Sequence, residues 1–422
     1  MTGPSDPSAA TASVDGPWSP LRITIYRALW IAGLASNVGT FMHLVAAGWA
    51  MSTISDSPTL VSLVQTAWGV PGFLLALHAG VFADLVDRRR LIIATQVAAL
   101  GIAAALGGLQ LTHHLPPVAL LAGTFLESVA LTMAAPAFMA LTPELVGLRF
   151  LPQAIGLDSI SRNLAQSVGP ALAGVVIAIA GPGAVFLVNA ASFVGVVGVV
   201  SRYRTAPPRS TSTEAFGRAI RAGVRTVVRT VALRRPVIRL ALLSAVNAAI
   251  AALMPVVARR RLHVAPAGFG ILAAALGVGS VAAAWALPRL RATTRPERTV
   301  LGAAFVWSAG AATFGSSTHL ATAVLGLLLA GAGAMATLNV FFSTYTLRLP
   351  PWMRGRGSSM AMLMVWLGAS AGAAGWGALA SGRGVRAALF IAAVVNIGVS
   401  VLARWSLSIS TGDDVAVVVV ER

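Results

Sequence analysis

The chain has 422 residues, of which 57% are hydrophobic and only 10% are charged, and its mean hydropathy is +0.81. Soluble domains carry about a quarter of their residues as charged ones, so this composition excludes a soluble globular protein and places most of the chain in lipid. The net charge of +18 does not indicate a nucleic-acid partner, because the basic residues are all Arg and stand in the breaks between apolar runs.

Residues 1–20 are rich in Pro, Ser, Thr and Asp and lack the basic start and short apolar core of a signal peptide. They are predicted to form a disordered cytoplasmic tail. A bilayer core needs roughly 20 apolar residues per helix, and the rest of the chain contains about twelve runs of that length. These runs are 26–51, 59–83, 91–111, 117–141, 153–180, 183–203, 236–258, 266–288, 299–316, 319–346, 357–380 and 385–406.

A longer polar stretch, 204–235, separates six runs in 21–203 from six in 236–406, and 407–422 forms a second tail. This pattern predicts an all-α membrane protein with twelve transmembrane helices in two six-helix bundles. Most Arg residues fall in segments that alternation places on one side, which predicts a multi-pass protein of the cell (inner) membrane with both termini cytoplasmic. The clear exception is the Arg cluster 259–261.

Within the stretch 204–235, Thr211 and Glu214 have the spacing of a capping box, and apolar and basic residues follow on separate stripes. The stretch is therefore predicted to be an amphipathic helix that lies on anionic membrane lipids. A solvated linker helix without lipid contact is the alternative. Small-residue stripes at 167–176 and 369–378 predict close approach between helices.

The turn GVFADLVDRRR, residues 80–90, joins the second run to the third. Its Gly80, Asp84, Arg88 and Arg89 resemble the signature loop between helices 2 and 3 of the major facilitator superfamily. The order of LRITIYRALWIAG (21–33), PAFMALTPELV (136–146), LPQAIGLDSISRNLAQSVGPALAG (151–174) and RALFIAAVVN (386–396) is similar to the branch that contains the enterobactin exporter and the transmembrane secretion effectors.

The resemblance implies the twelve-helix fold in a monomer. It also implies export of a siderophore, drug or other metabolite by proton antiport with alternating access. For Asp84 it implies a carboxylate that faces the N-terminus of the eleventh helix, near 355–358, where unpaired N–H groups attract an anion. An ordinary solvated Asp is the alternative. Arg88 and Arg89 are expected to pair with Glu144 or Asp87, or to act only as cytoplasmic positive charges.

Glu127 is the only carboxylate near the middle of a run. Gly123, Ala130, Ala134 and Ala137 share its helical face, so Glu127 is expected to face protein or a cavity rather than lipid. An ionisable group at this depth is costly, which makes Glu127 the candidate for proton coupling. A protonated Glu that only bonds a neighbouring helix is the alternative.

Asp158 and Arg162 are one turn apart in the favourable order for an ion pair, and they are expected to gate the inner mouth or simply to neutralise each other. Gly169, Pro170 and Gly174 resemble the glycine-proline signature of antiporters, which implies a helix bend; a plain packing kink is the alternative.

In the family fold, helices 1, 4, 7 and 10 line the cavity. In this sequence they offer His43, Asn247 and Asn339 beside Glu127 as candidate lining residues. A structural contact is the alternative for each of the other three.

The sequence contains no GxxxxGK[ST] phosphate loop, no Cys, and no cluster of metal ligands, so we expect neither an enzyme nor a bound metal or cofactor. The expected partners are a small-molecule substrate, protons and membrane lipids. A non-transporting sensor or scaffold on a transporter fold is the alternative function, and a solute flux measurement would separate the two.

Overall fold

The computed structural model describes residues 16–203, 230–349 and 354–406, and leaves the side chains of a few helical residues, 80–85 and 354–356 among them, outside the description. Within these ranges the chain forms one short 3-10 helix, ten α-helices and no strand. Their bounds are η1 Ser19–Arg22, α1 Thr24–Ile54, α2 Pro58–Leu85, α3 Arg88–Leu111, α4 Pro117–Arg202, α6 Val231–Arg260, α7 Pro266–Thr293, α8 Pro296–Ser316, α9 Leu320–Arg348, α10 Arg354–Arg383 and α11 Val385–Ser406.

The ten helices are long and apolar enough to cross a membrane, which confirms the predicted all-helical membrane class. Most predicted runs agree with a helix to within a few residues. The start of α6 at Val231 is a difference, because it extends into the stretch predicted as a linker. The rest of that linker, 204–229, and the tails 1–15 and 407–422 lie outside the described residues.

Helix α4 holds 86 residues, about 130 Å at 1.5 Å per residue, which is far longer than a bilayer is thick. Its backbone leaves helical geometry at Gly147 (φ 70°, ψ 167°) and Gly181 (φ 77°, ψ 171°). This conformation is essentially restricted to glycine. The two glycines divide α4 into segments 117–146, 148–180 and 182–202, and replace the loops that the sequence predicted around 142–152 and 181–182.

Gly181→Ala is expected to destabilise the protein by about 1–3 kcal/mol, because an alanine would be strained at φ 77° although open space surrounds the position. Gly198, in the helical part that follows, also has open space around it. Gly198→Ala is therefore the matched control and should be neutral or slightly stabilising. Thermal unfolding of both variants in detergent checks this, and equal midpoints would contradict it.

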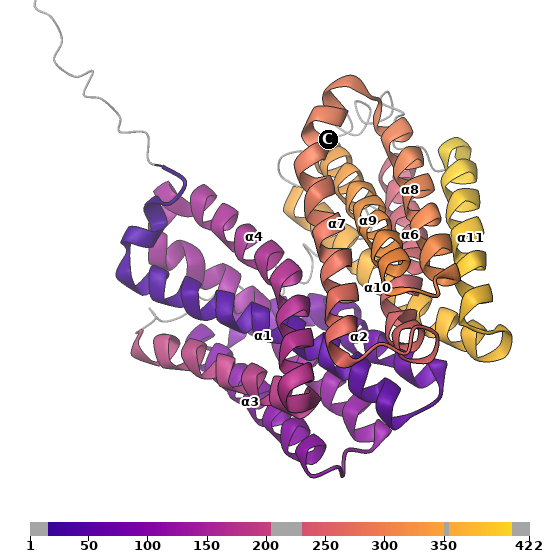
Figure 1. Ribbon diagram of the computed structural model, residues 1–422. Coiled ribbons are helices and arrows are strands. Elements are labelled where there is room, and N and C mark those ends of the chain that lie inside the picture. Colours follow the sequence, from indigo (N-terminus) through magenta and orange to yellow (C-terminus); the bar gives the residue numbers. More distant parts are fainter. Residues whose placement is uncertain (1–15, 204–229, 350–353, 407–422) are drawn as a thin grey trace, which may run out of the picture.

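Small residues bring helices from distant parts of the chain together (Figure 1). Gly174 of α4 meets Gly270 of α7 so closely that neither position has room for a Cβ. Gly372 of α10 lies equally close to the Ala245 carbonyl of α6. The predicted close approach at both small-residue stripes is thus confirmed.

We call the end of the molecule with the α1–α2 connection the Asp56 end, and the end with the α2–α3 turn the Arg88 end. Contacts between residues before 203 and residues after 230 gather toward the Asp56 end. Arg260 Nη2 is 2.8 Å from Asp56 Oδ1, and the hydroxyls of Thr59 and Ser381 are 2.8 Å apart. The rings of Trp49 and Phe269 stack with centroids 5.0 Å apart.

Helices α2 and α10 run antiparallel and contact each other between Thr59 and Gly72 of α2. Thr59 meets Ser381, Thr66 donates to the carbonyl of Ser370, and Gly72 packs on Trp366. The step from Gly72 to Asp84 along α2 equals the step from Trp366 back to Arg354, the first residue of α10. Extended beyond Gly72, this pairing would bring Asp84 level with the first turn of α10, but the side chain of Asp84 lies outside the described residues.

Candidate functional site

Three fully buried polar side chains, Glu127, His43 and Asn189, lie together inside the part of the chain before residue 203. His43 Nδ1 is 3.1 Å from Glu127 Oε2. Asn189 Nδ2 donates a 2.7 Å hydrogen bond to Glu127 Oε1 and is 3.3 Å from His43 Nδ1. We call these three residues the buried triad.

Each member of the buried triad comes from a different helical segment: His43 from α1, Glu127 from the first segment of α4 and Asn189 from its last. Gly39, one turn before His43, allows Asn189 to approach, because a Cβ there would lie 2.8 Å from Asn189 Oδ1. Phe186 covers the imidazole of His43 at 4.7 Å between ring centroids. The triad is thus enclosed between three segments.

The buried triad contains a carboxyl group and an imidazole that can share a single proton. With that proton on either Glu127 or His43 the pair is neutral overall, whereas its loss leaves an uncompensated negative charge in a dry place, which is costly. Their 3.1 Å contact lacks hydrogen-bond geometry, since Glu127 Oε2 has no hydrogen-bond partner among the described residues.

His43 Nε2 and Asn189 Oδ1 are buried without a partner in the described part of the chain. Such atoms are rare in folded proteins, and each calls for an explanation. A water, or a second arrangement of the three segments, would satisfy them. In this structure neither His43 nor Glu127 is exposed on a cavity wall, which differs from the expectation for His43.

The charged turn at the Arg88 end binds neighbouring helices. Arg88 Nη1 is ion-paired with Glu144 of α4, and Arg89 donates to the carbonyls of Val200 and Ser201. Asp87 does not pair with Arg88 but caps α3, accepting a 2.9 Å hydrogen bond from the Arg90 amide. Gly80 and Asp84 lie in the last turns of α2, and the Asp84 side chain lies outside the described residues.

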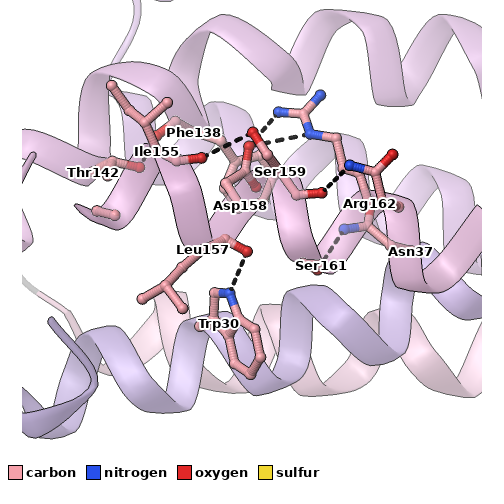
Figure 2. Close-up of polar contacts among 12 residues, drawn as sticks. Trp30, Asn37, Phe138, Thr142, Ile155, Leu157, Asp158, Ser159, Ser161 and Arg162 are labelled. Carbon is pink, nitrogen blue, oxygen red and sulfur yellow. Dashed lines mark hydrogen bonds and ion pairs between the residues drawn. The ribbon is translucent and has the colours of Figure 1, made fainter. Parts of the chain in front are cut away.

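Asp158 and Arg162 form an ion pair in the middle segment of α4, with Arg162 Nη2 2.5 Å from Asp158 Oδ2 (Figure 2). Three hydrogen bonds hold the neighbouring face of this segment against α1. Tyr26 donates to the carbonyl of Ala154 at 3.2 Å, Trp30 to that of Leu157 at 3.0 Å, and Asn37 to the Ser161 hydroxyl at 3.1 Å.

The backbone stays helical through 169–174, since the non-helical positions of α4 are Gly147 and Gly181. A Cβ on Gly169 would lie 2.8 Å from Phe41 Cβ of α1, and Gly174 packs on α7. In this state Gly169 and Gly174 serve close packing against α1 and α7, and the bend expected at Gly169, Pro170 and Gly174 stays a prediction.

Two further cavity candidates do not join the buried triad. Asn247 of α6 is half-buried, and its Oδ1 has no partner among the described residues. Asn339 of α9 is half-buried and donates a 3.4 Å hydrogen bond to the carbonyl of Met335 in its own helix.

Sequence reasoning missed Asn189 and one buried ion pair. Arg239 of α6 is fully buried and donates from Nη1 to Glu297 Oε2 at 2.8 Å and Oε1 at 3.0 Å. The Phe341 ring lies 5.3 Å from its guanidinium carbon. The only signal for Asn189 was its place as a polar residue in the middle of an apolar run.

The helical fold and the enclosed polar groups within it are typical of a membrane transporter. The family of transmembrane secretion effectors matches residues 15–420, so the chain belongs to this family and is a multi-pass transporter of the major facilitator type. This confirms the resemblance seen in the sequence. Transport by this family implies a small-molecule substrate.

Two relatives are similar in sequence. The uncharacterised MFS-type transporter y4rN of Sinorhizobium fredii is 29% identical over 320 residues, which are 73% of this chain and 76% of that protein. The staphyloferrin A transporter of Staphylococcus aureus is 26% identical over 154 residues, which are 36% of this chain and 39% of that protein.

Solved transporter structures share the fold at low sequence identity. A bacterial homologue of the human lysosomal transporter Spinster, inward-facing and occupied, superposes with a TM-score of 0.74 at 15% identity, covering 94% of this chain and 98% of that one. The nucleoside transporter NupG gives a TM-score of 0.68 at 13% identity, covering 90% and 98%. At these identities the likeness shows the fold alone.

Proposed function

We propose that this transporter exports a small molecule across the cytoplasmic membrane by proton antiport with alternating access. The observation that supports this most directly is the buried triad, because a fully enclosed carboxyl-imidazole pair within membrane-spanning segments is a site that can carry a proton. A siderophore, a drug or another metabolite is the substrate class. Among the relatives, the staphyloferrin A transporter makes that compound the first to test.

The proposed topology has twelve membrane crossings, because the three segments of α4 each cross once beside the nine other helices. They form two six-helix bundles on either side of the linker 204–235, which lies on membrane lipids. Both termini and the linker are cytoplasmic, so the Arg88 end faces the cytoplasm. The protein works as a monomer. Reporter fusions that place the linker outside the cell would overturn this topology.

The contacts at the Asp56 end support an inward-open state. They join the two bundles on the outer side through Asp56 and Arg260, and through Thr59 and Ser381. This also gives the exceptional outer Arg cluster 259–261 a role, since Arg260 is the partner of Asp56. Export requires that these contacts part while the cytoplasmic side closes.

In the proposed coupling, a proton competes with the substrate or water for the negative charge of the buried triad. When the transporter opens outward, Glu127 and His43 take up a proton from the more acidic side. When it opens inward, the proton leaves as water or a cationic group of the substrate enters and stabilises the negative charge. Asn189 holds one carboxylate oxygen through its amide, and thereby orients the other oxygen toward His43.

Two measurements test this proposal. Untargeted comparison of exported metabolites in a deletion strain and its complement should reveal a compound that depends on the protein. In proteoliposomes, flux of that compound should then follow an imposed pH gradient and stop when a protonophore dissipates the gradient. Unchanged metabolites would favour the sensor or scaffold, and flux that ignores the gradient would exclude antiport.

Asp84→Asn is expected to slow turnover several-fold while leaving membrane insertion intact. The reason is that the pairing of α2 with α10, extended beyond Gly72, would bring Asp84 level with the first turn of α10, where unpaired N–H groups favour a carboxylate. Such a contact would stabilise closure on the cytoplasmic side, with Arg88, Arg89 and Glu144 bracing the turn. Initial transport rates in proteoliposomes check this, and an unchanged rate would reject the role.

A further inference from the structure

The middle segment of α4 carries its charged pair well inside a candidate membrane-spanning helix. At 1.5 Å per residue, Arg162 lies about 22 Å from the break at Gly147 and about 28 Å from the break at Gly181. Charged side chains in such a helix need water, a partner or both. Yet the side chains of Arg162 and Asp158 remain 64% and 52% exposed.

Three stripes on this segment show which way the pair faces. The buried stripe of Ala154, Ser161 and Ala165 lies against α1, where three hydrogen bonds fix its rotation; Figure 2 shows those of Trp30 and Asn37. An apolar stripe at 160, 164 and 168 is exposed, as suits lipid. The exposed polar stripe at 158, 162 and 166 lies on the other side of the buried stripe, because successive residues turn by 100°. Its charged and polar side chains suit a water-filled space better than lipid.

The geometry of the ion pair leaves one edge of each group unused. Arg162 donates from both Nε and Nη2 to the same oxygen, Asp158 Oδ2, at 3.1 Å and 2.5 Å. Arg162 Nη1 and Asp158 Oδ1 have no partner among the described residues. A cationic donor and an anionic acceptor thus stand side by side, with the Gln166 amide one turn further along the same stripe.

We propose that Asp158 and Arg162 form a substrate-binding subsite for a carboxylate that carries a neighbouring hydroxyl or ammonium group. The guanidinium binds the carboxylate, since it is the side chain best matched to that shape. Asp158 Oδ1 accepts from the neighbouring donor of the ligand. This subsite deepens the transport function proposed above and rests on it. It is separate from the buried triad, and it replaces the gating role that the sequence suggested for the pair.

Binding of small probes to the purified full-length protein in detergent tests the subsite without any gradient. The probes are malate, which has a hydroxyl beside a carboxylate; succinate, which lacks the hydroxyl; and dimethyl malate, which lacks the charges. Titration calorimetry should show the order malate, then succinate, with dimethyl malate not bound. Absence of malate binding to the natural protein, or equal binding of dimethyl malate, would overturn the proposal.

Two variants test which side chain of the subsite binds the carboxylate of the probe and which binds its hydroxyl. Arg162→Gln should weaken malate binding at least about tenfold, as expected for lost hydrogen bonds between charged groups. Asp158→Asn should instead abolish the preference for malate over succinate. Arg289→Gln is the matched control, because Arg289 is exposed, stacks on Trp285 at 4.3 Å and stands in a neighbouring helix. It should leave binding unchanged, and an equal loss in this control would refute the assignment.

The outcomes separate the subsite from the proton-coupled mechanism. Uphill efflux by a protein that binds no malate would leave antiport standing and overturn the carboxylate subsite. Malate binding that depends on Arg162, in a protein without gradient-driven flux, would support the subsite and overturn antiport. Because the pair is exposed, its variants are expected to keep the melting temperature of the natural protein.

Discussion

Arg239→Leu is expected to lower the free energy of unfolding by about 3–5 kcal/mol, among the largest effects of any single substitution in this chain. The guanidinium of Arg239 is fully buried and contacts both oxygens of Glu297. Its Nη2 also donates to the carbonyl of Ser400 at 3.4 Å. Removing the Arg239 side chain takes away the partner that α6 supplies to the buried carboxylate of Glu297. Unfolding in detergent, followed by circular dichroism, measures the loss.

The double variant Arg239→Leu/Glu297→Leu is the control for this effect. Replacing both charges by apolar side chains also removes the buried carboxylate that loses its partner from α6, so most of the lost stability should return. Arg162→Gln provides the comparison with an exposed ion pair, where the change should stay below about 1 kcal/mol. If the double variant is no more stable than Arg239→Leu, the ion pair itself is not the cause.

The membrane-spanning helices were largely predictable, because a run of about 20 apolar residues has the length and composition of a helix that crosses the bilayer core. The ends of the helices were harder. The sequence placed a loop near 142–152, whereas the helix continues on both sides of Gly147. A glycine among apolar residues gives no sign that it adopts a φ of 70°, and only the packing of the segments around it decides this.

The sequence could not predict which side chains contact one another across different helices. Glu127 and His43 were each identifiable as costly polar groups in apolar runs, but their contact depends on how α1 rotates against α4. Arg239 stands near the start of the run 236–258, where the local sequence gives no sign that its side chain is buried. Its partner Glu297 begins another helix, and nothing in local spacing connects the two residues.

Spacing within one helix did predict a contact. Asp158 and Arg162 are four residues apart in the favourable order, and the structure contains their ion pair. What spacing could not give was the exposure of the pair. The exposure follows from the hydrogen bonds of Tyr26, Trp30 and Asn37, which fix the face of the segment that α1 covers.

Glu127→Gln is expected to abolish uphill efflux driven by a pH gradient while leaving downhill exchange of the substrate. Glutamine keeps the shape of the side chain and can still bond Asn189, so the three segments should stay together. It carries no exchangeable carboxyl proton, and the proton and the substrate then no longer compete for one charge. Flux in proteoliposomes, with and without the gradient, measures both processes on the same preparation.

Two variants show whether the effect comes from coupling or from packing. Glu127→Asp keeps a carboxyl group but shortens its reach to His43, so it should slow gradient-driven efflux without abolishing it. His43→Gln leaves Glu127 without the imidazole that shares its proton, so efflux should persist with an altered dependence on pH. If Glu127→Gln still drives efflux at the natural rate, the buried triad is not the coupling site. Asp158 then becomes the next carboxylate to test, because it is exposed beside Arg162 within a candidate membrane-spanning helix.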